Sequence, residues 1–207
     1  MTTKLVVISA GLSTPSSTRL LADRLAAAVG ERVVSTGSTT EVTVIELRDL
    51  AHDITNNLLT GFAAPKLQDA IDALSGADGA ILVTPIFTTS YSGLFKSFID
   101  VLDPDALTDL PVLIAATGGT ERHSLALDYS IRPLFTYLHS VVVPTAVYAA
   151  SSDWGVSAGS TSGLGERIDR AATELTALMH TSDRSSRVRD PFALPAGFSP
   201  VGGFGAQ

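Results

Sequence analysis

The sequence predicts an α/β fold in which five parallel strands form one sheet and helices cover both of its faces. The first observation is the apolar run from Leu5 to Ile8, which is typical of a strand buried on both faces. The second is that such runs alternate along the chain with segments of helical spacing. The third is the length of 207 residues, which suffices for one domain containing this sheet.

The other elements follow in chain order. Four further strands are predicted at Val42 to Leu47, Ala80 to Thr84, Val112 to Ala116 and Val141 to Val143. The predicted helices are Ser16 to Val29, Pro65 to Leu74, one that starts at Ser92, Ser124 to Leu138 with a kink near Pro133, and Leu164 to His180. Gly30 is expected to end the first helix. The segment from Arg48 to Ala64 has no regular period and could reach a neighbouring subunit.

Composition excludes several classes of function. The chain has 14 Lys and Arg against 21 Asp and Glu, and its net charge of -7 argues against nucleic acid as a partner. It contains 0 cysteines, so disulfides and cysteine-ligated metals are excluded, and its 4 histidines are too scattered for a metal motif. No apolar run is long enough to span a membrane and no signal peptide is evident, so we expect a cytoplasmic protein.

The loop after the first strand has the residues of an anion site. The strand ends at Ser9, and hydroxyl groups then crowd the start of the following helix at Ser13, Ser16, Ser17 and Thr18. A helix N-terminus presents unpaired N–H groups and partial positive charge, and Arg19 adds a cation, so a terminal phosphate fits here. The alternative is that Ser16 or Ser17 only caps the helix. Neither the P-loop nor the dinucleotide glycine motif is present. Glu46 lies at the end of the second strand, where a dinucleotide-binding fold has its ribose-binding acid, but without the glycines we interpret this placement as chance.

Two more strands are followed by similar loops. After Thr84, Pro85 is expected to break the strand, and a loop with hydroxyls and the rings of Phe87 and Tyr91 runs to Ser92. This lining suits the edge of a flat heteroaromatic ring, although such a turn could equally pack on its own helix. After the fourth strand comes Thr117 to His123, in which paired glycines would allow close approach of a ligand ring. Because ligands of parallel sheets bind beyond the carboxyl ends of strands, we expect all three loops to form one site.

The motifs S-A-G-L-S-T-P-S-S-T-R, T-P-I-F-T-T-S-Y-S-G-L-F-K-S-F-I-D and A-T-G-G-T-E-R-H together resemble the flavodoxin-like NAD(P)H-dependent FMN reductases. The resemblance covers about Lys4 to Tyr148 and is greatest to the branch that supplies reduced flavin to luciferase-like monooxygenases. It implies a flavodoxin-like three-layer fold and two sets of FMN contacts. The phosphate contacts would be Ser9, Ser13, Ser16, Ser17 and Thr18, and the isoalloxazine contacts would be Pro85, Ile86, Phe87, Thr88, Thr117, Gly118 and Gly119. Relatives often have tyrosine where this chain has Phe87.

The resemblance implies hydride transfer from NADPH or NADH to flavin N5, which requires close stacking of two rings rather than a side-chain acid. His123 is the candidate for a catalytic contact, or else it packs in the helix that follows. Arg122 is the candidate for a 2′-phosphate contact. The alternatives are an FMN-bound quinone or azo reductase and, in another class, a flavodoxin-like electron carrier.

The chain is expected to form a flavodoxin-like domain over residues 1–182, followed by a tail over residues 183–207. Trp154 lies in a polar loop and either covers a ligand or fixes the loop. The tail spaces Phe192, Phe198 and Phe204 six apart among prolines and glycines, so it is either disordered or an arm that docks on another subunit. A homodimer or homotetramer is therefore expected.

Overall fold

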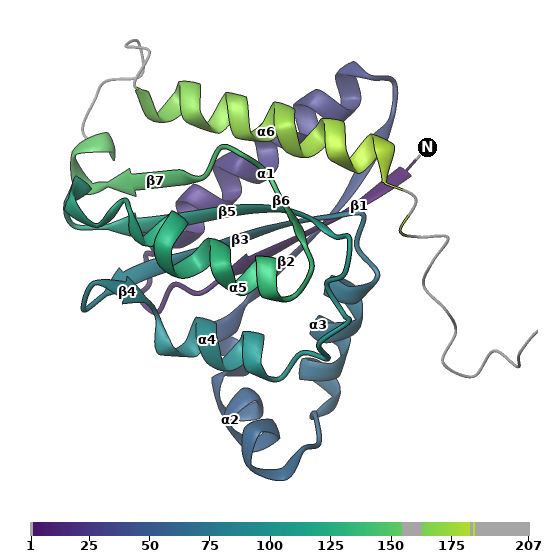
Figure 1. Cartoon of the computed structure of the whole chain (residues 1–207), viewed down its shortest axis with the longest axis vertical. Helices are drawn as coiled ribbons and strands as arrows, with labels where there is room; N and C mark the ends of the chain where they lie inside the picture. The colour runs from purple at the N-terminus through teal and green to yellow at the C-terminus, as the bar shows by residue number, and fades with distance from the viewer. Residues whose placement is uncertain (1, 155–162, 183, 185–207) are drawn as a thin grey trace, which may run out of the picture.

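The computed structural model describes residues 2–154, 163–182 and 184. One twisted sheet runs through the molecule with helices on both sides (Figure 1). Its strands are β1 (Thr2–Ser9), β2 (Thr39–Glu46), β3 (Gly79–Phe87), β5 (Pro111–Gly118) and the short β6 (Val141–Val142) and β7 (Val147–Ala150). The order β2-β1-β3-β5-β6 is parallel throughout, and β7 also pairs with β5. The five-position parallel sheet of the flavodoxin-like prediction is confirmed.

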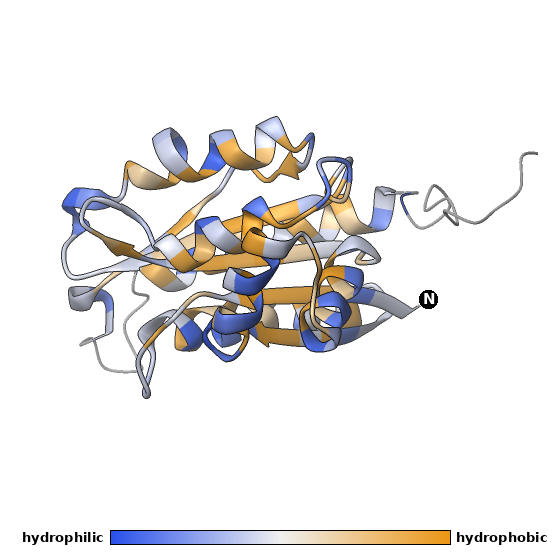
Figure 2. Ribbon diagram, turned by 90° about the horizontal axis from the view of Figure 1, so that it is seen from below, coloured by the Kyte–Doolittle hydropathy of each residue, from blue (hydrophilic) through white to orange (hydrophobic). Residues whose placement is uncertain are grey.

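Helices cover the sheet in two layers. The first face carries α1 (Ser17–Ser35) and α6 (Gly163–Thr181). The second carries α3 (Pro65–Ser75), α4 (Gly93–Asp100) and α5 (Arg132–Tyr137), with α2 (Ala51–Thr60) beyond them. Leu5 and Val7 of β1 pack toward the first layer, whereas Val6 and Ile8 pack toward the second. This alternation explains why the whole run is apolar, and Figure 2 shows the hydrophobic strands between the two layers.

The first helix is longer than predicted, and the expectation that Gly30 ends it is wrong. The helix α1 continues to Ser35 because Val33 is completely buried against the core of that face. Gly30 faces open space, so its only cost is the low helix propensity of glycine, about 1 kcal/mol. The burial of one residue in the following turn therefore outweighs the local stop signal.

Pro85 does not break its strand, contrary to the prediction. Strand β3 passes through Pro85 and ends at Phe87, where a two-residue turn leads into β4 (Ser90–Tyr91), which pairs antiparallel with it. The carbonyl of Val83 accepts a hydrogen bond from the Ala10 amide, so alternate residues of β3 face β1. Pro85 is two residues further on the same side, where β1 has already ended, and its missing N–H therefore leaves no partner unpaired.

The fifth position of the sheet is split at Pro144, and the prediction found only its first half. Side chains from two helices bind the backbone in the gap. Arg132 donates to the carbonyls of Val143 (2.9 Å) and Pro144 (3.1 Å), and the Glu174 carboxylate accepts from the Thr145 N–H (2.7 Å). The interruption is therefore hydrogen-bonded on both sides and not frayed.

The remaining segments connect these elements. The region from Arg48 to Ala64 contains a 3-10 turn, η1 (Leu47–Leu50), and the whole of α2, so it is more regular than its sequence suggested. The helix predicted from Ser124 to Leu138 consists of a π-helical segment, η3 (Leu127–Ile131), that leads directly into α5, and Pro133 lies in the first turn of α5. Two further 3-10 turns are η2 (Glu121–His123) and η4 (Ser151–Trp154). The predicted tail over residues 183–207, apart from Arg184, lies outside the described residues.

Candidate active site

The three predicted loops lie together at the carboxyl edge of the sheet. The register places Ser9 beside Val83, and Thr84 beside Ala116, so the loops that follow β1, β3 and β5 start at similar heights. A hydrogen bond of 2.8 Å between the hydroxyls of Thr18 and Thr117 joins the first loop to the third. Residues 99 positions apart in sequence are thereby in direct contact. The structure supports the interpretation that these loops belong to one site.

The first loop presents only part of its hydroxyl set to the surface. Ser13 and Ser17 are exposed and Ser16 is half-buried. The Ser16 hydroxyl accepts a hydrogen bond from the Arg19 N–H at 3.2 Å, so Ser16 is the N-cap of α1. Capping and ligand binding are compatible here, because the remaining amides of the first turn and the hydroxyls of Ser13 and Ser17 face solvent beside it.

The other two predicted phosphate contacts are buried. Ser9 is 0% exposed, and its Oγ has no hydrogen-bond partner among the described residues. Thr18 is 2% exposed and its hydroxyl is engaged with Thr117. A buried hydroxyl without a partner is costly, so the Ser9 hydroxyl at the end of β1 is a candidate to hydrogen-bond a ligand. Thr18 is placed to fix the loop, and the accessible donors are Ser13, Ser16 and Ser17.

Gly11 is required by the close packing of this loop. A Cβ at this position would lie 2.1 Å from the Ser16 Oγ and 3.2 Å from the Thr18 Cβ. Any side chain at Gly11 would therefore displace the capping hydroxyl of α1. The turn from β1 into α1 is built around this contact.

An arginine from outside the loop, Arg48, holds it in place, and sequence analysis missed this residue. The Arg48 Nη1 donates to the Ser13 carbonyl (2.9 Å) and to the Thr14 hydroxyl (2.5 Å). Arg19 and Arg48 both pair with Glu46, at 2.6 and 2.8 Å. Hydrogen bonds and charge from Asp23 and then Glu46 raise the pKa of Arg19, although its partial burial opposes them. Glu46, interpreted from sequence as a chance placement, is thus the centre of an ion-pair cluster beside the loop.

The second loop exposes an aromatic ring on a strained turn. Phe87 is 47% exposed, and the turn residues Thr88 and Thr89 have φ of +48° and +71°. This left-handed conformation is unusual for β-branched residues and costs of order 1–3 kcal/mol each. Tyr91 instead packs on Phe95, with ring centroids 6.1 Å apart. Phe87 is the ring of this loop that remains available for stacking, beside the half-buried Ile86 and the buried Pro85.

Below that turn, the strand end is fixed by a buried network. The Thr84 hydroxyl accepts from the Ser92 N–H (3.1 Å), and the Ser92 hydroxyl accepts from the Phe95 N–H (3.1 Å), which caps α4. The structure therefore confirms the predicted helix start, and it positions the hairpin rigidly relative to α4.

The third loop contains two glycines with different roles. A Cβ on Gly118 would lie 2.0 Å from the Tyr148 Oη, whereas no atom lies within 4 Å of a Cβ on Gly119. The Tyr148 hydroxyl donates to the Thr120 carbonyl at 2.8 Å. Burial, followed by the negative charge of Glu121, raises the pKa of this tyrosine. Gly118 is therefore needed by the protein's own packing, and Gly119 is the position open to a ligand.

The candidate residues that follow lie in η2. His123 is half-buried and Arg122 is exposed. Glu121 accepts a hydrogen bond from the Ser152 hydroxyl, which lowers the pKa of its carboxyl and links this turn to η4. In η4, Trp154 packs on the core beside α1, with the Arg24 guanidinium carbon 4.9 Å from the ring centroid. These contacts favour the interpretation that Trp154 fixes its loop.

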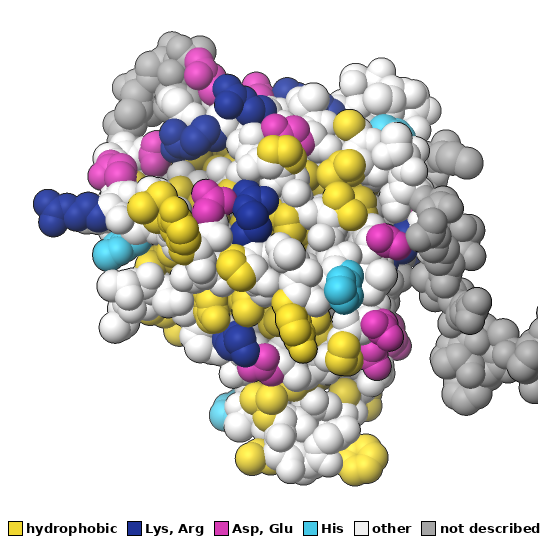
Figure 3. Space-filling model, viewed as in Figure 1, with side chains coloured by type: hydrophobic (Ala, Val, Ile, Leu, Met, Phe, Trp, Pro, Cys, Tyr) yellow, Lys and Arg dark blue, Asp and Glu magenta, His cyan; other side chains and the backbone are white. Residues whose placement is uncertain are grey.

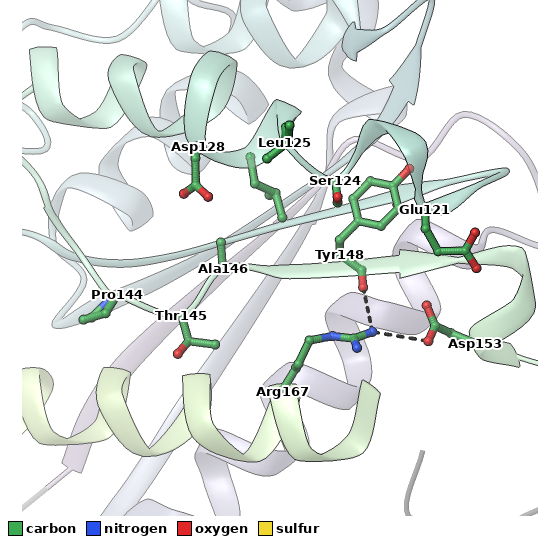
Figure 4. A pocket seen from close by; sticks show the side chains of 11 residues that line it. Glu121, Ser124, Leu125, Asp128, Pro144, Thr145, Ala146, Tyr148, Asp153 and Arg167 are labelled. Atoms are coloured by element: carbon green, nitrogen blue, oxygen red, sulfur yellow. Dashed lines mark hydrogen bonds and ion pairs between the residues drawn. The ribbon is translucent and has the colours of Figure 1, made fainter. Parts of the chain in front are cut away.

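A pocket of about 510 Å³ lies on the outer side of β7, between η3 and α6 (Figure 4). It includes none of the predicted flavin contacts. On its wall, Arg167 donates to the Tyr148 carbonyl (3.1 Å) and pairs with Asp153 (3.2 Å), while Asp153 accepts from the Ala150 N–H (2.8 Å). These charged groups hydrogen-bond the backbone carbonyl and N–H groups at the free edge of β7. Covering an edge in this way is a common protection against pairing with another strand.

Two classes of site receive no support from the described part of the chain. Among residues 2–154, 163–182 and 184, no group of three or more His, Asp or Glu side chains could hold a metal ion. Within the same residues, no helix is both long and apolar enough to cross a membrane.

Comparison with known proteins gives consistent results. The family model described as NADPH-dependent FMN reductase matches residues 3–155. An FMN reductase (NADPH) of Pseudomonas aeruginosa is 39% identical over 151 residues, which are 73% of this chain and 78% of that protein. The NADH-dependent FMN reductase SfnF of Pseudomonas fluorescens is 35% identical over 178 residues, which are 86% of this chain and 92% of the relative.

Solved structures show the same likeness. An oxidoreductase from Corynebacterium diphtheriae is 48% identical with a TM-score of 0.83, over 87% of this chain and 98% of that one. The apo form of an NADH:FMN oxidoreductase is 31% identical with a TM-score of 0.76, over 88% and 93%. Because the family model spans most of the chain and the relatives match over most of their length, the chain belongs to the NADPH-dependent FMN reductase family, as its motifs predicted.

Proposed function

We propose that FMN binds along the carboxyl edge of the sheet, with its phosphate at the start of α1 and its ring between the second and third loops. The observation that carries this proposal is the joint placement of the exposed Ser13 and Ser17, the exposed Phe87 ring and the open Gly119 around one edge. The residues fit the group, because the N-terminus of the 19-residue α1 attracts an anion and the unpartnered Ser9 hydroxyl lies beneath it.

Bound FMN would supply a ring that accepts hydride at N5 from NADPH or NADH. The residues of this chain orient the two rings and exclude competing reactions. Phe87 would border one side of the ring, and the backbone at Thr117 and Gly119 would border the other, since the Thr117 side chain is buried and its hydroxyl is engaged with Thr18. The Thr18–Thr117 hydrogen bond keeps the phosphate end and the ring end at a fixed separation. No described side chain has to donate a proton, since reduced flavin takes its proton from water, and His123 and Arg122 are proposed only as contacts of the nicotinamide nucleotide.

We expect NADPH or NADH to bleach the oxidised flavin band when one equivalent is added anaerobically to the protein with FMN. The rate with each donor, followed by visible absorbance, gives the nucleotide preference; relatives named above include one NADPH and one NADH enzyme. If flavin binds but stays oxidised with both donors, the chain is an electron carrier. Retention of FMN through gel filtration, with reduction of quinones or azo compounds, would favour the reductase that keeps its flavin.

We also propose that the chain is a cytoplasmic homodimer or homotetramer that passes reduced FMN to a two-component monooxygenase. The apolar end of α2 supports self-association, because Leu59 and Phe62 are each 80% exposed and Leu58 is 47% exposed. Figure 3 shows hydrophobic side chains gathered at that end of the molecule. Patches of this kind on a soluble protein commonly mark contacts between chains.

Two variants test the oligomer. Replacing Leu59 and Phe62 with serine is expected to yield a smaller species by light scattering, because it removes the exposed apolar side chains. A chain that ends at Arg184 tests whether residues 185–207 act as the docking arm suggested by their phenylalanines. An unchanged mass for the shortened chain would reject the arm, and an unchanged mass for the serine variant would reject the α2 contact.

A further inference from the structure

The loop between β1 and α1 is held by a residue that follows β2. Arg48 lies in η1, 35 residues after Ser13, and reaches the loop because β2 lies beside β1. Its Nη1 donates to the Ser13 carbonyl (2.9 Å) and to the Thr14 hydroxyl (2.5 Å). Its Nη2 lies 2.8 Å from Glu46 Oε2, an ion pair whose angles do not make a hydrogen bond. Both terminal nitrogens of the guanidinium are thus committed to protein groups.

Glu46 connects this contact to the helix that follows the loop. Its second oxygen accepts from Arg19 Nη1 (2.6 Å), and Arg19 lies in the first turn of α1. The Glu46 side chain is only 14% exposed, so its negative charge needs both arginines close by. One carboxylate therefore links the middle of the anion loop, through Arg48, and the first turn of α1, through Arg19, to the end of β2.

We propose that Arg48 is a positioning residue for the flavin phosphate. It holds the loop so that Ser13, Ser16 and the amides of α1 converge on one point, and it acts through the loop rather than by pairing with the phosphate. A loop already held in the binding conformation does not have to be ordered when the ligand arrives, and this preorganisation raises affinity. The inference rests on the proposed function, in which the phosphate of FMN occupies this loop.

The test compares a flavin that has the phosphate with one that lacks it. Dissociation constants of FMN and riboflavin are measured by quenching of flavin fluorescence for the wild-type chain, Arg48→Ala and Arg48→Lys. We expect Arg48→Ala to weaken FMN by about tenfold, the usual effect of losing charge-assisted hydrogen bonds, and to change riboflavin by less than about twofold. Arg48→Lys should recover little, since a single ammonium cannot reproduce the fork that reaches both the loop and Glu46.

The matched control is Arg32→Ala. Arg32 is likewise paired with a carboxylate, the exposed Asp169 at 3.4 Å, but it lies near the opposite end of α1. The Arg32→Ala variant should leave the dissociation constants of FMN and riboflavin unchanged. This control separates the loss of a positive charge in general from the loss of the loop contact. Thermal unfolding of each variant confirms that the flavin measurements compare folded proteins.

A double variant separates positioning from direct pairing. Thr14→Val removes the hydroxyl that accepts from Arg48 and should weaken FMN by a smaller factor. If Arg48 acts through the loop, Arg48→Ala combined with Thr14→Val binds FMN no more weakly than Arg48→Ala alone. Multiplication of the two effects, or an equal loss of FMN and riboflavin, would overturn the inference. A wild-type chain that binds no FMN would overturn the proposed function itself, which is visible before any variant is made.

Discussion

The Arg184→Ala variant is expected to lose about 3 kcal/mol of unfolding free energy, because one buried and three part-buried backbone carbonyls lose their shared donor. The guanidinium donates to the carbonyls of Ser75 (2.7 Å), Ala77 (3.0 Å), Thr108 (2.9 Å) and Ala106. Arg184 is only 7% exposed. Its burial lowers the pKa of the guanidinium, while the nearby charges of Asp109 and Asp78 raise it. Urea denaturation followed by circular dichroism measures the loss.

A lysine variant and two shortened chains test whether the effect is specific to Arg184. Arg184→Lys should be nearly as unstable as the alanine variant, since one ammonium cannot reach all four carbonyls that lie around the edge of the guanidinium group. A chain that ends at Arg184 should be as stable as the full chain, whereas one that ends at Ser182 should match Arg184→Ala. If both shortened chains have the stability of the full chain, the carbonyls do not depend on Arg184 and the interpretation is wrong.

The two glycines of the third loop are expected to respond oppositely to alanine. Gly118→Ala places a methyl group 2.0 Å from the Tyr148 Oη and 3.0 Å from its ring carbon Cζ. Tyr148 is 7% exposed and hydrogen-bonded, so it has little room to move. We expect a loss of about 2 kcal/mol in unfolding free energy, as is usual for overpacking of a buried site.

Gly119→Ala should instead leave the stability within about 0.5 kcal/mol, because no atom lies near the added methyl group. If the flavin ring approaches the backbone at Gly119, the same methyl group obstructs it, and FMN should bind about tenfold more weakly. Denaturation curves and flavin titrations of both variants provide the comparison. Wild-type flavin affinity in Gly119→Ala would place the ring elsewhere.

The signals that sequence analysis used were local, and they succeeded where local chemistry decides. The apolar run at Leu5 to Ile8 predicted a central strand because both faces of that strand are covered, which the structure confirms. The start of a helix at Ser92 was predicted from the apolar helical pattern that follows, and the structure places Ser92 as the N-cap of that helix. Gly30 and Pro85 misled the same analysis, since the burial of Val33 and the early end of β1 are set by distant parts of the chain.

The sequence by itself determined the family, the alternation of strands and helices, and the three loops that carry hydroxyls and glycines. Only the tertiary structure decided which hydroxyls are accessible: Ser13 and Ser17 are exposed, whereas Ser9 and Thr18 are buried. It also decided that Arg48 binds the loop between β1 and α1 and that Arg184 joins the segments that precede β3 and β5. Such contacts join residues tens of positions apart, so no periodicity or spacing encodes them. They arise because a parallel sheet places the ends of distant strands side by side.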